Sequence, residues 1–250
     1  MAPLPRATLE SLLRARKLDR TLTTALPPTD PQDALAIASS GIAAVDAVLG
    51  GGFPRGHLSE LVGPHSSGRT SLLLQTLVAT TRRGELAALV DALDTFDVES
   101  GAAAGLDFDR LLWIRGQVVS SPGFCRDTNQ RAIEQAIRAL ALVLQAGLFG
   151  LVVFDVAGVP PDALRRLPFT TWLRLQRMVE GGQTACVLVG GEPMARSSAG
   201  LTMRFEIRDG EGIRSGLLGG RRVDARVVRA RARISEEATV AVITVVPECA

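Results

Sequence analysis

The 250-residue chain has the length of one α/β domain with an extension, and its net charge of +2 is too small to indicate a nucleic-acid binder without a local basic cluster. Its 46% hydrophobic content is ample for a core, but no apolar run reaches a membrane span and no signal-peptide core begins the chain. Three widely spaced cysteines, Cys125, Cys186 and Cys249, lack metal or redox spacing, so a reducing cytoplasm is the expected location.

The N-terminal segment is predicted to be separate from the body of the chain. Leucines and basic residues over 6–25 have helical spacing, and a proline-rich stretch follows. We therefore expect a helical arm over residues 1–25, a linker over 26–38 and a core domain over 39–250. The arm either folds onto its own domain or docks on a neighbouring subunit or partner. Its candidate contact residues are Leu9, Leu12, Leu13 and Arg16.

A glycine-punctuated turn between a predicted strand (58–62) and a predicted helix from Ser71 carries the clearest chemical signal. It follows the phosphate-loop pattern G-x-x-x-x-G-K-[ST], in which backbone N–H groups and a helix N-terminus hold phosphate oxygens. The alternative is an ordinary Gly/Ser turn. The candidate nucleotide-binding residues are Gly63, Pro64, His65, Ser66, Ser67, Gly68, Arg69, Thr70 and Ser71.

Arg69 occupies the position where this pattern has lysine. Arginine keeps the positive charge but replaces a compact ammonium with a longer planar fork. The substitution is therefore compatible with nucleotide binding, whereas fast turnover is not expected.

The order of predicted elements indicates an α/β fold. Strands are expected at 86–90, 111–115, 148–155 and 185–189, with helices over 126–146 and 170–180 between them. The apolar run before Asp155 is typical of a buried parallel strand, whose carboxyl end is where ligands lie in open α/β sheets.

Three further strands are expected beyond Arg204, and the second of them is rich in arginine. A shift at Val227–Val228, consistent with a bulge, separates two groups of outward arginines. Such a row fits nucleic acid or an acidic partner; the alternative is a solvated edge strand protected by its charge. The candidate contact residues are Arg226, Arg229, Arg231 and Arg233.

The sequence from Ser39, SSGIAAVDAVLGGGFPRGHLSELVG followed by GPHSSGRTSLLLQ, resembles the ATPase core of bacterial RecA-type recombinases. In that family a TG…LD…LGGG.P.G segment leads into GP.SSGKT, and the resemblance is good over 39–97. It implies a RecA-like P-loop core: a mostly parallel central sheet flanked by helices, with antiparallel C-terminal strands. It also implies ATP and Mg²⁺ as ligands, with Thr70 and Asp155 at the metal and Asp97 beside the adenine.

Several positions depart from the recombinase pattern. The strand that should end Asp-Ala-Glu ends Asp-Ala-Leu93, so the residue that activates water is absent there. Nearby Asp94 and Asp97 are alternative bases, and a solvated loop with helix-capping aspartates is the simpler interpretation. The strand before Gly191 lacks the Asn-Gln phosphate sensor. The two segments that match the family's long DNA-binding loops are short.

This combination resembles the ImuA group of RecA-like accessory proteins, whose G…LD..L.GGG.PRG.L.E opening is matched from Gly41 to Glu60. The resemblance implies a role in damage-induced mutagenesis and translesion synthesis, with absent or very weak ATPase. Its expected partners are a RecA-type recombinase and an ImuB-type polymerase-like protein, with weak or indirect contact to DNA. The alternative is an active DNA-dependent ATPase that serves recombinational repair.

Overall fold

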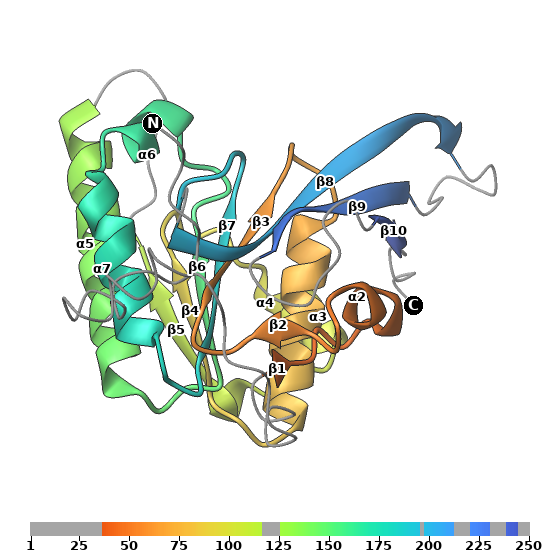
Figure 1. Cartoon of the computed structure of the whole chain (residues 1–250), viewed down its shortest axis with the longest axis horizontal. Coiled ribbons are helices and arrows are strands. Elements are labelled where there is room, and N and C mark those ends of the chain that lie inside the picture. Colours follow the sequence, from red (N-terminus) through yellow and green to blue (C-terminus); the bar gives the residue numbers. More distant parts are fainter. Residues whose placement is uncertain (1–36, 117–125, 196–197, 213–220, 231–238, 245–250) are drawn as a thin grey trace, which may run out of the picture. The chain divides into compact units, whose positions relative to one another are not determined.

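The structure is a computed structural model that describes residues 37–116, 126–195, 198–212, 221–230 and 239–244 (Figure 1). All of these belong to the second of the two units into which the chain divides, residues 34–250. The predicted arm with Leu9, Leu12, Leu13 and Arg16 lies outside the described residues, as do Arg231 and Arg233.

An eight-stranded sheet forms the centre of the domain, in the order β10-β9-β8-β3-β7-β6-β4-β5. The strands from β8 to β5 are parallel, whereas β9 is antiparallel to both of its neighbours, β8 and β10. A separate two-stranded sheet pairs β1 (Ile37–Ala38) with β2 (Phe53–Pro54). The main strands are β3 (Leu58–Val62), β4 (Ala87–Asp91), β5 (Leu111–Arg115), β6 (Leu151–Asp155), β7 (Ala185–Gly190), β8 (Ala199–Gly212), β9 (Arg221–Ala230) and β10 (Thr239–Thr244).

Helices cover both faces of this sheet, because its central strands are apolar on both sides. One core lies between the sheet and α2 and α3, and the other between the sheet and α5, α6 and α7 (Figure 1). The predicted fold class is confirmed. The helices are α2 (Ala43–Val48), α3 (Arg69–Arg82), α4 (Val98–Ala103), α5 (Arg126–Ala146), α6 (Pro161–Arg165), α7 (Phe169–Val179) and the 3-10 helix η3 (Phe108–Arg110).

Three features differ from the sequence-based expectation. The short helix α6 interrupts the segment that follows β6, which was predicted to run without a helix to 170. Strand β8 begins at Ala199, five residues before the predicted start, because it pairs along β3 from Leu58 onward. The interpretation of the arginine-rich strand as an edge strand is wrong, since β9 lies between β8 and β10.

The predicted bulge in β9 is confirmed. Thr202 of β8 faces Arg229, but the next residue, Met203, faces Val227, so Val228 is the extra residue. Val227 is buried and Val228 is 40% exposed. The inserted residue therefore changes which positions of β9 point outward.

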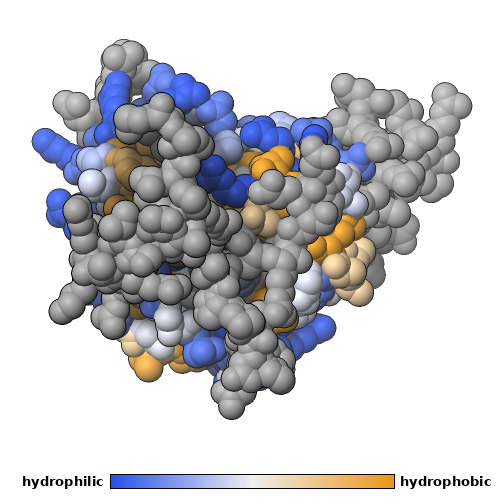
Figure 2. All heavy atoms as spheres, viewed as in Figure 1, coloured by the Kyte–Doolittle hydropathy of each residue, from blue (hydrophilic) through white to orange (hydrophobic). Residues whose placement is uncertain are grey.

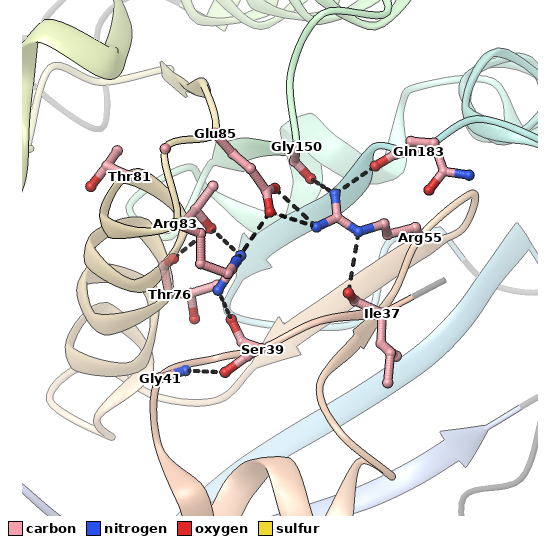
Figure 3. A network of polar contacts seen from close by, with 12 residues as sticks. Ile37, Ser39, Gly41, Arg55, Thr76, Thr81, Arg83, Glu85, Gly150 and Gln183 are labelled. Carbon is pink, nitrogen blue, oxygen red and sulfur yellow. Dashed lines mark hydrogen bonds and ion pairs between the residues drawn. The ribbon is translucent and has the colours of Figure 1, made fainter. Parts of the chain in front are cut away.

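A polar network joins the chain segments at the amino ends of the parallel strands (Figure 3). The Arg55 guanidinium donates to both carboxylate oxygens of Glu85, at 3.0 and 2.9 Å, just before β4 begins. It also donates to three backbone carbonyl oxygens, those of Ile37, Gly150 and Gln183. One side chain thus fixes the entry points of β1, β4, β6 and β7.

Among the described residues, no helix combines the length and the apolar character needed to cross a lipid bilayer.

Candidate functional site

The predicted functional residues of the core meet at the carboxyl ends of four neighbouring strands. The phosphate loop follows β3, while Asp91, Asp155 and Gly190 are the last residues of β4, β6 and β7. Strand register places Asp91 opposite Asp155, and Val62 opposite Gly190. The parallel sheet therefore brings both sequence signatures to one edge.

The phosphate loop has the conformation that its glycines permit. Gly68, at the N-cap of α3, has φ 85°, and Ser66 has φ 58°, so both lie in the left-handed region. At Gly63 a Cβ atom would lie 2.6 Å from the carbonyl oxygen of Phe205, which leaves no room for a side chain. The loop therefore depends on both glycines of the motif.

Side chains of the loop divide into an exposed and a buried set. Pro64, His65, Ser66 and Thr70 are exposed, and Ser71 is half-buried. Ser67 is 1% exposed, and its hydroxyl oxygen has no hydrogen-bond partner among the described residues. An orphaned buried hydroxyl is typical of a site completed by a ligand or water.

Arg69 points into the protein and not toward the exposed face of the loop. Arg69 is 5% exposed, and its Nη1 donates a hydrogen bond to the carbonyl oxygen of Gly190. Burial lowers the pKa of the guanidinium, and the nearby charge of Asp155 opposes that effect in part. In the phosphate-loop pattern the basic side chain reaches the terminal phosphates, and the observed conformation of Arg69 differs from that pattern.

Asp155 lies at the tip of β6 and is partly exposed. Its Oδ1 accepts a hydrogen bond of 2.9 Å from the backbone N–H of Ala157. The pKa of this carboxyl is raised, mainly because the group is buried and also because of the nearby negative charge of Asp91. The hydrogen bond from Ala157 N–H and the positive charge of Arg69 lower the pKa in part. A Mg²⁺ ion would reverse this balance by favouring the ionised form.

Asp91 has a structural environment. It is 1% exposed and accepts hydrogen bonds from the backbone N–H groups of Thr95 and Phe96 and from the indole of Trp113. These bonds fix the start of the segment that contains Leu93. The carboxylate therefore lies on the same face of the sheet as Asp155 but is engaged by the segment that follows β4.

Leu93 stands where the recombinase pattern has the residue that activates water. Its Cδ1 would lie 2.9 Å from a Cβ placed on Gly158, so it packs against the segment that follows β6. An apolar side chain at this place cannot accept a proton from water.

Asp94 and Asp97 both have partners within the protein. Asp94 has φ 57° and accepts two hydrogen bonds of 2.7 Å from Arg115, which lower its pKa and make it a poor general base. Asp97 caps α4 by accepting hydrogen bonds from Glu99 N and from Ser100 N and Oγ. This favours the capping interpretation, while contact of Asp97 with an adenine stays a prediction.

The residues present fit Mg²⁺ and nucleotide phosphates only in part. The glycine loop, the amino end of α3, the exposed Thr70 and the partly exposed Asp155 are compatible with binding. The inward Arg69 and the apolar Leu93 are not suited to hydrolysis.

Sequence reasoning missed the role of Glu60. This residue of β3 is 1% exposed, and its carboxylate accepts hydrogen bonds from Met194 N, Ala195 N and Thr202 Oγ1 at 2.7, 2.7 and 2.8 Å. A charged residue inside an apolar strand, as in Leu-Ser-Glu-Leu-Val, was the available signal, because buried charges need partners. The glutamate fixes the segment after β7 beside the site.

Arg226 and Arg229 are exposed on β9, two strands from β3, which leads into the phosphate loop. Arg226 lies opposite Arg204 of β8 and Thr239 of β10, and Arg229 lies opposite Thr202. The structure therefore places these two candidate residues on the antiparallel part of the sheet, with Arg226 in register, through Arg204, with Val62 at the end of β3.

A doubly wound sheet with a phosphate loop after β3 and aspartates at the tips of β4 and β6 is the architecture of a P-loop domain. The RecA N-terminal domain matches residues 23–164, more than half of the chain, and the protein belongs to this family. The RecA-like part of the sequence-based prediction is confirmed.

Individual relatives agree with this assignment. The protein is 38% identical to RecA of Corynebacterium jeikeium (strain K411) over 136 residues, which are 54% of this chain and 32% of that protein. It is 39% identical to RecA of Prochlorococcus marinus (strain MIT 9211) over 128 residues, 50% of this chain and 30% of that one. The chain thus spans about a third of the length of these relatives.

A crystal structure of the RadB recombinase has the same fold. It superimposes with a TM-score of 0.58 and covers 82% of this chain and 94% of that one, at 20% sequence identity. This similarity extends the fold assignment beyond the region matched in sequence.

Proposed function

We propose that this protein is a RecA-family accessory protein of the bacterial DNA-damage response that acts by binding and has absent or very weak ATPase activity. Its partners in translesion synthesis would be a RecA-type recombinase and an ImuB-type polymerase-like protein. The observation that carries the proposal is the buried Arg69, whose guanidinium donates to the Gly190 carbonyl.

The position of Arg69 bears directly on catalysis. Transfer of a phosphoryl group needs a cation that follows the charge developing on the transferred phosphate. A guanidinium that is 5% exposed and bonded to the main chain of β7 must leave that bond before it can serve. Lysine, as a flexible point charge, would not depend on such a rearrangement.

The other elements of hydrolysis are weakened at the same edge of the sheet. Leu93 replaces the base, and Asp94 is held by Arg115. When bound, Mg²⁺ would neutralise phosphate charge, and Thr70 and Asp155 are the residues suited to hold it. The site is therefore suited to retain a nucleotide and poorly suited to cleave it.

Short segments at the carboxyl end also favour binding of proteins over exchange of DNA strands. Five residues, 156–160, separate β6 from α6, and eight, 191–198, separate β7 from β8. Glu60 holds two backbone N–H groups of the second segment. A short segment that is held at Met194 and Ala195 is a poor mobile clamp for DNA, whereas it suits a preformed protein surface.

The decisive experiment is steady-state ATP hydrolysis with and without single-stranded DNA, with nucleotide binding measured on the same samples by fluorescence. We expect no DNA-stimulated turnover in the wild type. Arg69→Lys alone should not restore it, because Leu93 is unchanged; Arg69→Lys combined with Leu93→Glu should give measurable turnover if the scaffold is otherwise competent. Asp155→Asn in the double variant serves as the matched control and should abolish that turnover.

DNA-stimulated hydrolysis by the wild type that Asp155→Asn removes would contradict the proposal. The protein would then be the active DNA-dependent ATPase of the alternative interpretation. The arm is tested separately: removing residues 1–25 should weaken recombinase binding, and unchanged binding would rule out its role.

A further inference from the structure

The last residue of β7, Gly190, is bound to the phosphate loop at two points. Its carbonyl oxygen accepts a hydrogen bond from the Arg69 guanidinium and a second one, of 3.3 Å, from the backbone N–H of Gly63. Gly63 is the first residue of the loop, and Arg69 is the first residue of the helix that follows it. One carbonyl group therefore joins both ends of the loop to the strand that leads into the segment after β7.

The Arg69 side chain has a better partner available when the site is occupied. Within the described part of the chain, Gly190 is the one hydrogen-bond acceptor found for its five N–H groups. A phosphate is a stronger acceptor than a neutral carbonyl, because it is charged and accepts two parallel N–H groups of a guanidinium. A bound nucleotide can gain this contact only after Arg69 has left Gly190, so it favours the released conformation.

The segment beyond Gly190 is attached a second time, and this attachment does not involve the phosphate loop. The buried Glu60 carboxylate accepts hydrogen bonds of 2.7 Å from the backbone N–H groups of both Met194 and Ala195. Residues 191–193, between the two attachments, are exposed. This short turn therefore has one end that a ligand can release and one end that stays fixed.

The movement that release permits is local. A Cβ atom on Gly190 would collide with the Met194 side chain, so Gly190 is itself closely packed and cannot move far. Gly191 has open space around it, since a Cβ placed there would meet no atom within 4 Å. Two successive glycines also allow backbone conformations that other residues rarely adopt. Rotation of the peptide group between Gly190 and Gly191 is therefore the expected change.

Such a rotation would disturb little of the core. Glu192 pairs with Arg165 of α6 at 2.6 Å, but both side chains are more than half exposed, so the pair contributes little to stability. Figure 2 shows hydrophilic atoms around α6 and the neighbouring helix ends, at the upper left, with a smaller hydrophobic area among them. The turn thus lies beside a largely hydrated surface.

We propose that the contact between Arg69 and Gly190 is a nucleotide-sensitive latch. In the empty site it holds the peptide group between Gly190 and Gly191, whereas a bound nucleoside triphosphate draws Arg69 to its phosphates and lets residues 191–193 change conformation. This inference rests on the part of the proposed function in which the site retains a nucleotide. It adds a means of regulation, because occupancy of the loop would alter an exposed turn that a partner protein can contact.

Nuclear magnetic resonance of the full chain, labelled with ¹³C and ¹⁵N, tests the latch. Spectra are compared with and without the non-hydrolysable ATP analogue AMP-PNP and Mg²⁺. The carbonyl carbon of Gly190 and the amide nitrogen of Gly191 belong to one planar peptide group, so both report on hydrogen bonding at that carbonyl. The amide of Gly68 reports on occupancy of the loop, and the amide of Met194 reports on the fixed end of the turn.

Two variants separate the latch from a general effect of losing an arginine. Arg69→Met removes the contact in the absence of nucleotide. Arg82→Met is the matched control: Arg82 lies in the last turn of the same helix and donates to the carbonyl oxygen of Ala104 at 3.5 Å.

In the wild type, AMP-PNP should shift the Gly68 resonance, and the Gly190 carbonyl carbon should move upfield as it loses one of its two hydrogen bonds. The Gly191 amide should shift with it, whereas Met194 should shift little. Arg69→Met should show the Gly190 and Gly191 shifts without nucleotide, and nucleotide should then add little to them. Arg82→Met should behave as the wild type does.

The proposal is wrong if AMP-PNP shifts Gly68 but leaves Gly190 and Gly191 unchanged, because Arg69 then keeps its contact in the occupied site. It is also wrong if Arg69→Met leaves both resonances unchanged, or if Met194 shifts as strongly as Gly191. All three outcomes leave the proposed function intact. No shift at Gly68 at about 5 mM AMP-PNP, above the usual range of substrate affinities, would overturn the latch together with nucleotide retention.

Discussion

Two arginines lie at opposite ends of the same sheet, Arg55 half-buried and Arg69 buried, and their environments differ. At the amino ends of the strands, Arg55 has a carboxylate partner in Glu85 and three carbonyl acceptors. At the carboxyl ends, Arg69 has the Gly190 carbonyl as its hydrogen-bond acceptor, and its pKa is lowered by burial. The first guanidinium is well compensated and the second is not.

The two arginines are therefore expected to affect the stability of the fold differently. A buried cation with matched partners is strongly destabilising to remove, because its partners are then left without donors. A buried cation with incomplete partners costs stability while it stays. Arg55 therefore stabilises the fold. Arg69 costs stability, and its position in the phosphate loop is one where a positive charge can serve phosphate binding.

The largest expected effect comes from breaking the amino-end network. Arg55→Ala leaves Glu85 and three carbonyl groups without their donor and should lower the free energy of unfolding by about 3–5 kcal/mol. Arg83→Ala is the matched control: Arg83 is more exposed and also bonds Glu85, and its removal should cost about 1 kcal/mol or less. Urea unfolding followed by circular dichroism measures both. Equal losses in the two variants would contradict the central role of Arg55.

The Glu85 side of the network gives a pH-dependent effect. Burial raises the pKa of Glu85, but the hydrogen bonds and charges of Arg55 and Arg83 outweigh it and hold the pKa below its ordinary value near 4.5. The stability from this lowered pKa is present above the ordinary value and is lost as pH falls through the folded-state value. Glu85→Gln should therefore cost about 1–3 kcal/mol at neutral pH and progressively less in acid. A cost that does not change with pH would show that charge is not involved.

Removing the site arginine should have a much smaller effect. Arg69→Met loses one hydrogen bond but also removes a poorly compensated buried charge, so the free energy of unfolding should stay within about 1 kcal/mol of the wild type. The same urea unfolding curves serve for this comparison. A loss as large as that of Arg55→Ala would mean that Arg69, too, is structural.

The smallest expected effect on stability is that of Asp155→Asn, and its sign is opposite to that of Glu85→Gln. Because burial leads the net rise in the pKa of Asp155, the protonated form is favoured in the fold, and stability is lost as pH rises through the raised value. Asp155→Asn should raise the urea midpoint slightly at neutral pH and leave it unchanged in acid below the ordinary aspartate pKa. A lower midpoint at neutral pH would mean that the ionised carboxylate stabilises the fold, through Arg69.

Most of the fold could be predicted because its strands are short apolar runs bounded by glycine and charged residues. The predicted strand at 111–115 and helix over 126–146 have the observed bounds. Helix α6 was missed because a five-residue helix that begins at the second of two prolines carries too little periodicity. The place of β9 was missed because strand order follows from pairing with distant segments, which local patterns do not encode.

The sequence predicted which residues form the candidate site, but not the directions in which their side chains point. Spacing identified the phosphate loop and Asp155, since glycine and a strand-end aspartate are required by local geometry. The direction of Arg69 could not be read from the sequence, because it depends on the Gly190 carbonyl, 121 residues away. The fixed position of Met194 depends likewise on Glu60 of β3, 134 residues away.

The extra residue in β9 has a consequence for how this strand can change length during evolution. Loss of Val228 would place Arg229 directly after Val227, so the pairs Thr202–Arg229 and Met203–Val227 would be kept and the strand would alternate regularly. Arg229 would stay outward, and Ala230 would still pack on the apolar core. A deletion at Val228 should therefore be tolerated, whereas a deletion away from the bulge would exchange inward and outward positions on one side of it.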